Sequence, residues 1–178
     1  DLSGITSLCL RVARDFPGIA NSLGSVNGSI LIIGKPGCGK TTLLRDLIRL
    51  RSEQKNECVC VVDERFEIFP RYCGKFCFQT GMNTDVLSGY KKATGVEMAI
   101  RSMGPDAIAI DEITAEDDCK ALLHTGWCGI CLLATAHAGS KGDLLSRPIY
   151  RPIVDSCLFD TLVVMNRDMS FRTERMYS

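Results

Sequence analysis

The fold of this chain is decided by the stretch Gly34-Lys35-Pro36-Gly37-Cys38-Gly39-Lys40-Thr41, which matches the pattern G-x-x-x-x-G-K-[ST]. An apolar run, 29–33, precedes it, and a segment of helical period, 41–51, follows it. In a strand, loop and helix arranged in this order, glycines let successive backbone N–H groups and the helix N-terminus face an anion. We therefore expect a phosphate-binding loop that extends through Thr42, with Lys40 on the β and γ phosphates and the Thr41 hydroxyl on Mg²⁺.

Short apolar runs alternate with segments of helical period along the rest of the chain. Amphipathic patterns predict helices over 41–51 and 96–103, and Thr114 followed by Asp117 indicates the start of a third helix that Gly126 would end. The runs expected to form buried strands are 29–33, 58–62, 107–110, 130–136 and 162–165. The alternation predicts an α/β fold in which helices flank one mostly parallel sheet of five strands.

Three segments fall outside this pattern. The interval 66–90 has no clear period and contains Pro70 and several glycines, so we expect an irregular surface excursion. The alternation of Leu8, Leu10 and Val12 with other residues predicts a strand outside the main sheet. After the last apolar run, a turn near Asp168 predicts a C-terminal hairpin through 171–177.

Length and composition limit the class of protein. The 178 residues predict a single domain, 1–178, and because the chain begins at Asp1 rather than Met we expect an N-terminal domain of the full-length protein to be missing. The apolar fraction of 46% with 24% charged residues excludes a disordered chain. A net charge of zero gives no broad basic field, so nucleic acid is not an expected partner. The apolar runs have the length of strands, so we expect no direct insertion into a membrane.

Two acidic pairs follow predicted strands. Asp111 and Glu112 come directly after the run 107–110, as in a Walker B strand, where Asp111 would hold Mg²⁺ and Glu112 would deprotonate the attacking water. A kinase has to exclude water, so Glu112 favours an ATP hydrolase. Asp63 and Glu64 follow the run 58–62 and would lie at the same edge of the sheet. Glu64 is then the second candidate base, unless the pair is only a solvated strand end.

His137 and Arg101 are further candidates for the catalytic site. His137 follows the run 130–136, which we expect between the loop strand and the Walker B strand, so that His137 would sense the γ-phosphate. The alternative is a structural, hydrogen-bonded histidine. Arg101 lies near the end of the helix before the Walker B strand, either as a cation at a helix C-terminus or as a charge clamp on phosphate, in its own site or a neighbour's.

Ten cysteines are the unusual feature of the composition. The chain is long enough to bury a core without disulfides, and we expect no signal peptide and a reducing cytosol. Cys73 with Cys77 and Cys128 with Cys131 have spacings that zinc ligands use. Because about 50 residues separate the two pairs, we expect core packing for most cysteines and keep zinc as the alternative.

Eight segments together resemble the ATPase domain of the stage III sporulation protein AA family, over about 7–177. In chain order they are Gly37-Cys38-Gly39-Lys40-Thr41-Thr42-Leu43-Leu44-Arg45-Asp46, Val62-Asp63-Glu64-Arg65, Thr84-Asp85-Val86-Leu87, Arg101-Ser102-Met103, Pro105-Asp106, Asp111-Glu112-Ile113, Thr135-Ala136-His137 and Arg147-Pro148. The chain departs from the family in having Phe66 after Asp-Glu-Arg, where a small polar residue is usual, and Asn83 in place of an Arg before Thr-Asp-Val-Leu.

The resemblance implies a RecA-like P-loop NTPase fold of the kind found in the ATPases of type II secretion, type IV secretion and type IV pili. These form homo-hexameric rings with nucleotide sites between subunits. It implies that Asp63 and Glu64 correspond to an acidic box, Asp111 and Glu112 to Walker B and His137 to a histidine box, and that Arg101 is a site residue. It also implies Mg²⁺-dependent ATP hydrolysis that powers a channel between mother cell and forespore. The protein would then be cytoplasmic and peripheral, with membrane-embedded channel components as partners.

Other functions are weighed against this one. A RecA-like motor stimulated by nucleic acid is the main alternative, since relatives in photosynthetic lineages carry an added nucleic-acid-binding module. A GTPase needs a base-reading Asn-Lys-x-Asp, and Asn166-Arg167-Asp168 has the wrong spacing. Glu112 disfavours a small-molecule kinase.

Overall fold

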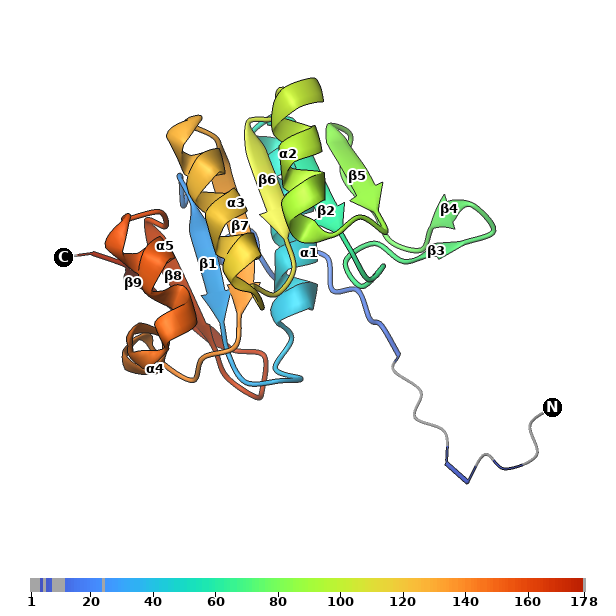
Figure 1. Cartoon of the computed structure of the whole chain (residues 1–178). Helices are drawn as coiled ribbons and strands as arrows, with labels where there is room; N and C mark the ends of the chain where they lie inside the picture. The colour runs from blue at the N-terminus through green and yellow to red at the C-terminus, as the bar shows by residue number, and fades with distance from the viewer. Residues whose placement is uncertain (1–3, 5, 8–11, 24, 178) are drawn as a thin grey trace.

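A computed structural model describes residues 4, 6–7, 12–23 and 25–177. Its centre is a seven-stranded sheet of order β5-β2-β6-β7-β1-β8-β9, in which all neighbours are parallel except β8 and β9 (Figure 1). The strands of this sheet are β1 (Ile30–Ile33), β2 (Val59–Asp63), β5 (Thr84–Ser88), β6 (Ala107–Ile110), β7 (Cys131–Ala136), β8 (Thr161–Met165) and β9 (Phe171–Arg175). The mostly parallel α/β fold expected from the sequence is confirmed.

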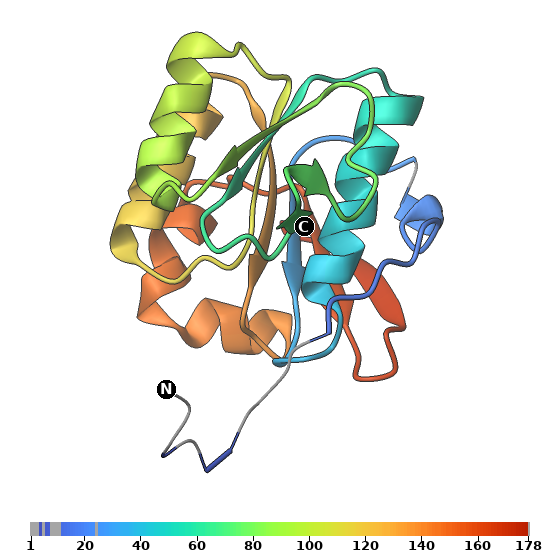
Figure 2. The ribbon, with the colours of Figure 1, turned by 90° about the vertical axis from the view of Figure 1, so that its right-hand side faces the viewer.

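Helices cover both faces of the sheet. They are η1 (Asn21–Leu23), α1 (Lys40–Gln54), α2 (Lys92–Ser102), α3 (Glu116–Trp127), α4 (Lys141–Ser146), η2 (Pro148–Tyr150) and α5 (Arg151–Asp155). In Figure 2, α1 lies on one side of the sheet with the segment that contains η1, while α2, α3 and α5 lie on the other. Two buried apolar clusters correspond to these two faces, one built around α1 and the other around α2, α3 and α5.

The five predicted strands are present, and each begins and ends within one residue of its expected position. The expectation of five strands is wrong, however, because β5 and β9 extend the sheet at its two edges. β9 is the return strand of the predicted C-terminal hairpin. β5 lies inside the interval 66–90 and pairs with β2 along its whole length. It is only partly buried, so its sequence lacks the apolar run that marks the central strands.

The interval 66–90 is therefore less irregular than expected. Besides β5 it contains a short hairpin of β3 (Arg71–Tyr72) and β4 (Lys75–Phe76), which projects from the body of the domain in Figure 1. The buried Asp63 carboxylate fixes the start of the interval 66–90, because it accepts backbone hydrogen bonds from Glu67 and Phe69, each at 2.8 Å. Asp63, expected with Glu64 as an acidic pair at the site, thus has a structural role in holding this segment.

The predicted ends of α3 are corrected by the structure. The carboxylate at its start belongs to Asp118, which accepts the N–H groups of Thr114 and Ala115 at 2.9 and 3.1 Å, whereas Asp117 pairs at the surface with Lys120. Gly126 does not end the helix. It lies within it and permits close packing against Leu158, whose side chain an added Cβ would overlap.

Part of the predicted N-terminal strand lies outside the described residues. Leu8 and Leu10 lie outside the described residues, and residues 12–15 have no regular secondary structure. None of the helices in the described part of the chain combines the length and the apolar character that a membrane span requires.

Two helical glycines allow a test of the packing. An alanine at Gly95 of α2 would place its Cβ against Cγ1 of Val62, whereas at Gly142 of α4 the nearest atom outside the neighbouring backbone would be Ser140 Oγ at 3.8 Å. We expect Gly95→Ala to lower the free energy of unfolding by about 1–3 kcal/mol, because overpacking outweighs the gain in helix propensity. Gly142→Ala, the control, should raise it by a few tenths of a kcal/mol up to about 1. Denaturant titration measures both, and a stabilising Gly95→Ala would contradict the packing described.

Candidate functional site

The phosphate-binding loop joins the carboxyl end of β1 to the first turn of α1. Gly39, the residue before the helix, has φ = 94°, a conformation that glycine adopts without strain. Gly34 packs so closely on the Cys38 sulfur that no side chain would fit there. The thiol of Cys38 is thus buried beneath the loop, and the loop presents backbone and the side chains of α1 on its outer side.

Lys40 is buried at the start of α1 and is held above the loop. Its ammonium donates to the carbonyl oxygens of Gly34 at 3.0 Å and Lys35 at 3.2 Å, and to Nδ1 of His137 at 2.9 Å. Since an ammonium has only donors, Nδ1 of His137 accepts, which places the proton of the neutral ring on Nε2. A weaker contact of Nδ1 with the Gly34 carbonyl, at 3.4 Å, does not change this assignment.

His137 connects the phosphate loop to the Walker B acids. Its Nε2 lies 2.9 Å from Oε1 of Glu112, to which it donates. The two strands that carry these side chains are neighbours, because β7 lies between β1 and β6 as the sequence predicted. A continuous chain of hydrogen bonds therefore runs from Lys40 through His137 to Glu112.

Asp111 lies beside Thr41 at the carboxyl end of β6. The Thr41 hydroxyl is 3.1 Å from Oδ2 of Asp111, and the Thr135 hydroxyl donates to its Oδ1 at 2.8 Å. Thr135 is fully buried on β7 and was not among the expected site residues. A single hydroxyl in the apolar run 130–136 was the signal that could have identified it.

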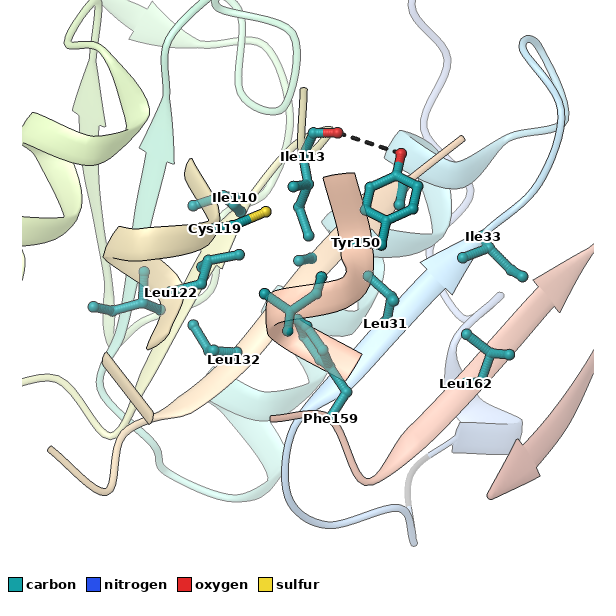
Figure 3. Close-up of a cluster of buried hydrophobic side chains, with 14 of the residues drawn as sticks. Leu31, Ile33, Ile110, Ile113, Cys119, Leu122, Leu132, Tyr150, Phe159 and Leu162 are labelled. Carbon is teal, nitrogen blue, oxygen red and sulfur yellow. Dashed lines mark hydrogen bonds between the residues drawn. The ribbon is translucent and has the colours of Figure 1, made fainter. Parts of the chain in front are cut away.

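The backbone at Glu112 has φ = 26°, which is unusual for a residue with a side chain. Hydrogen bonds fix it in this conformation. The Glu112 N–H donates to Thr135 Oγ1 at 2.9 Å, and the next N–H, of Ile113, donates to the Thr135 carbonyl at 2.8 Å. Figure 3 shows the Tyr150 hydroxyl pointing at the Ile113 carbonyl oxygen, 3.5 Å away, from the core below. The turn thus directs the Glu112 side chain toward His137.

These residues line one cavity of about 660 Å³. Of the predicted phosphate-binding residues, Pro36, Gly37, Gly39, Lys40, Thr41 and Thr42 line it, together with Asp111, Glu112, Thr135 and His137. Three segments that were not expected there complete its lining: 12–16, Phe66 to Pro70, and Met169 in the C-terminal hairpin. The lining thus combines the polar groups of the phosphate loop and the acidic pair with apolar side chains such as Val12, Phe16 and Phe66, and a nucleotide likewise combines polar phosphates with a flat base.

Arg45 ties these segments to α1. It is almost completely buried, and its guanidinium donates to the carbonyls of Arg14 at 2.9 Å, Glu67 at 3.1 Å and Ile68 at 2.5 Å. On the next residue of α1, the Asp46 carboxylate accepts the N–H groups of Gly18 and Ala20. The segment 12–20 is therefore anchored directly to the helix that begins at the phosphate loop.

Glu64 lies outside the main cavity. It faces a smaller cavity of about 20 Å³ on the other side of Asp111 and Glu112, and its carboxylate is 3.3 Å from the ammonium of Lys92. Glu112 lines both cavities and contacts His137, so the geometry favours Glu112 over Glu64 as the base that faces a nucleotide.

Arg101 is not brought to the phosphate site of its own chain. α2 begins near Glu64 and runs back to the amino edge of the sheet, where Asp106 accepts the Cys58 N–H at 2.8 Å. Arg101 lies in the last turn, is 75% exposed and has its nearest acidic partner, Glu97, at 3.8 Å. A role at a neighbouring subunit's site stays a prediction.

The expectation of core packing for most cysteines is wrong for the residues that the structure describes. Cys38, Cys60 and Cys119 are buried and Cys58 and Cys131 are partly buried, whereas Cys73, Cys77, Cys128 and Cys157 are exposed. Burial raises the pKa of the Cys60 thiol to about 12 and that of Cys119 to about 11, so neither is a reactive thiolate near neutral pH. Cys73 and Cys77 lie at the hairpin beyond the carboxyl end of β2, whereas Cys131 begins β7 at the opposite edge. The described residues contain no group of three or more side chains placed to bind one metal ion.

Comparison with known proteins agrees with this geometry. The family model described as "Sporulation stage III, protein AA" matches residues 2–175. The chain is 39% identical over 175 residues to stage III sporulation protein AA of Bacillus subtilis (strain 168), and this alignment covers 93% of the chain and 57% of that protein. The chain thus spans little more than half the length of this relative.

Two solved structures share the fold. The VirB11 ATPase of the Brucella suis type IV secretion system, in complex with sulphate, matches with a TM-score of 0.60 and 18% identity, over 88% of this chain and 48% of that one. The pilus retraction motor PilT with bound ADP matches with a TM-score of 0.65 and 13% identity, over 95% and 55%. At these identities the likeness shows the P-loop secretion-ATPase fold. With the family model matching almost from end to end, the chain belongs to the stage III sporulation protein AA family.

Proposed function

We propose that this chain is the ATPase domain of a ring-forming motor that hydrolyses ATP with Mg²⁺ and drives a membrane-embedded sporulation complex between mother cell and forespore. The observation that carries the proposal is the chain of contacts from Lys40 through His137 to Glu112, with both links at 2.9 Å. It connects the cation that would hold the terminal phosphates with the carboxylate that would activate water.

This chain of contacts makes Glu112 responsive to phosphate. A γ-phosphate is an acceptor for Lys40, so its arrival competes with Nδ1 of His137 for the ammonium. When His137 loses that donor, its ring is free to turn, and the carboxylate of Glu112 becomes available to a water molecule. His137 would in this way report the occupancy of the phosphate site to the base.

The donor set beside Lys40 fits Mg²⁺. The Thr41 hydroxyl and the Asp111 carboxylate are 3.1 Å apart and supply the oxygen ligands that this ion prefers. Thr135 fixes the orientation of Asp111 by donating to its other oxygen. Bound there, Mg²⁺ would offset the negative charge of the phosphates.

The assembly and the location of the motor rest on the relatives. VirB11 and PilT are named as a type IV secretion ATPase and a pilus retraction motor, and a relative 39% identical is a sporulation protein. We infer a homo-hexamer peripheral to the cytoplasmic face of a membrane complex. The cavity opens beyond the carboxyl edge of the sheet, where a neighbouring subunit could supply a residue such as Arg101.

Replacing the loop lysine tests nucleotide binding. Lys40→Ala removes the ammonium that would contact the terminal phosphates, and we expect a fall in ATP turnover of roughly 10²-fold or more. Lys120→Ala, on the exposed side of α3, removes the same charge far from the cavity and should leave turnover unchanged. Steady-state phosphate release measures both. Equal activity of the two variants would contradict the assignment of the loop.

Replacing the proposed base separates binding from hydrolysis. Glu112→Gln keeps the size of the side chain but removes the acceptor of the proton, so hydrolysis should fall by roughly 10²–10⁴-fold. Affinity for a fluorescent ATP analogue should stay within about twofold, because the phosphate loop is unchanged. Glu116→Gln, exposed at the start of α3, is the control. If Glu112→Gln hydrolyses ATP normally, the base lies elsewhere, and Glu64 is the next residue to replace.

Dilution tests the ring. If a neighbour completes each site, specific ATPase activity should rise with protein concentration in parallel with the hexamer observed by analytical ultracentrifugation. A dilute monomer with the full specific activity would contradict the ring mechanism. Stimulation by single-stranded nucleic acid, without any effect of assembly, would favour a nucleic-acid motor instead.

A further inference from the structure

Lys92 is a buried cation in an unfavourable place. It is the first residue of α2 and only 8% exposed. The N-terminus of a helix repels positive charge, and burial of an ammonium is costly unless the group is paired. No pattern in the sequence assigns it a role. Acceptors or negative charges beside the ammonium are therefore needed to offset the helix dipole and the loss of solvation.

The partners of Lys92 come from two different parts of the fold. Its ammonium lies 3.3 Å from Oε2 of Glu64, which follows β2. It also lies 3.7 Å from Oδ2 of Asp118 and donates to the Thr114 hydroxyl at 3.4 Å, both near the start of α3. Lys92 thus joins the loop after β2 to the turn that follows Glu112.

Lys92 also lines the small cavity, together with Glu64, Asp111 and Glu112. Its lining includes five carboxylates, which belong to Asp63, Glu64, Glu67, Asp111 and Glu112, and two cations, Arg65 and Lys92. Arg65 is exposed, so Lys92 is the buried counter-charge within this lining. Asp63 and Asp118 have backbone N–H donors of their own, whereas Lys92 is the ion-pair partner of Glu64 in the described structure.

We propose that Lys92 is a positioning residue for the hydrolysis reaction: it holds the Glu64 carboxylate against the lining of the small cavity that Glu64 shares with Asp111 and Glu112. The inference rests on the proposed function, since it assigns a role within that reaction. Lys92 acts through Glu64 and touches neither the phosphate loop nor the main cavity. Its removal should therefore slow the reaction without weakening the binding of ATP.

The test is a double-mutant cycle measured by steady-state ATP hydrolysis. Lys92→Met should lower kcat roughly 10-fold, which is the scale of the coupling energy between residues in direct contact. The KM for ATP should stay within about twofold of the wild-type value. Glu64→Gln should lower kcat similarly. The double variant should be no slower than Glu64→Gln alone, because Lys92 acts through Glu64. Lys92→Arg keeps the charge and should restore most of the lost rate.

Lys91→Met is the matched control. It makes the same substitution one residue away, at an exposed position, and should leave kcat unchanged. The proposal is overturned if Lys92→Met behaves like Lys91→Met, or if the losses from Lys92→Met and Glu64→Gln multiply in the double variant. Should Lys92→Met fail to fold, Glu64→Gln still decides, because an unchanged kcat in that variant leaves Lys92 nothing to position.

The outcomes also distinguish this proposal from the proposed function. Wild-type protein that hydrolyses ATP and loses activity on Glu112→Gln, but tolerates Lys92→Met, overturns only the role of Lys92. Wild-type hexamer without any ATP turnover overturns both.

Discussion

The position of β7 between β1 and β6 is the constraint on which the site depends. A parallel sheet brings the carboxyl ends of its strands to one edge, and the central strand of the three then faces both neighbours. Two side chains at the carboxyl end of β7 contact these neighbours. Thr135 holds Asp111 and the strained turn at Glu112, and His137, two residues later, connects Glu112 with Lys40. The phosphate loop and the acidic pair are about 70 residues apart in sequence and are brought into one network by a single strand.

The central strands and the position of the phosphate loop could be predicted from the sequence because both have clear sequence patterns. The buried strands are apolar runs, and the loop pattern lies between a strand and a helix, so that both the sheet and the places of Lys40, Asp111 and Glu112 followed. The edge strand β5 was missed because a half-covered strand needs no apolar run. The capping carboxylate of α3 was assigned one position too early, because two aspartates follow each other in the sequence and only the fold shows that Asp118 is buried at the helix start while Asp117 is exposed.

The parts of the site that escaped prediction depend on contacts distant in sequence. Thr135 and Lys92 are ordinary residues in their own segments, and their importance comes from the carboxylates that the fold places beside them. The part that residues 12–16 take in lining the main cavity was also unforeseen, because hydrogen bonds with Arg45 and Asp46 on α1 hold this segment in place. Arg101 shows the converse: the sequence left open whether it serves its own site or a neighbour's, and α2 carries it to the edge of the sheet away from its own phosphate loop.

The anchoring of residues 12–20 to α1 has a mechanical consequence. The lining of the main cavity includes both the phosphate loop and residues 12–16 of this segment, so a ligand that fills the cavity contacts both. Arg45 and Asp46 lie about one turn beyond Thr41, so the segment and the loop are fastened to the same short piece of helix. Thermodynamic linkage requires that such coupling act in both directions. If ligand binding displaces the segment, then a force that displaces the segment alters the affinity for the ligand by the same free energy. The first turns of α1 then couple ligand binding in the cavity to movement of residues 12–20.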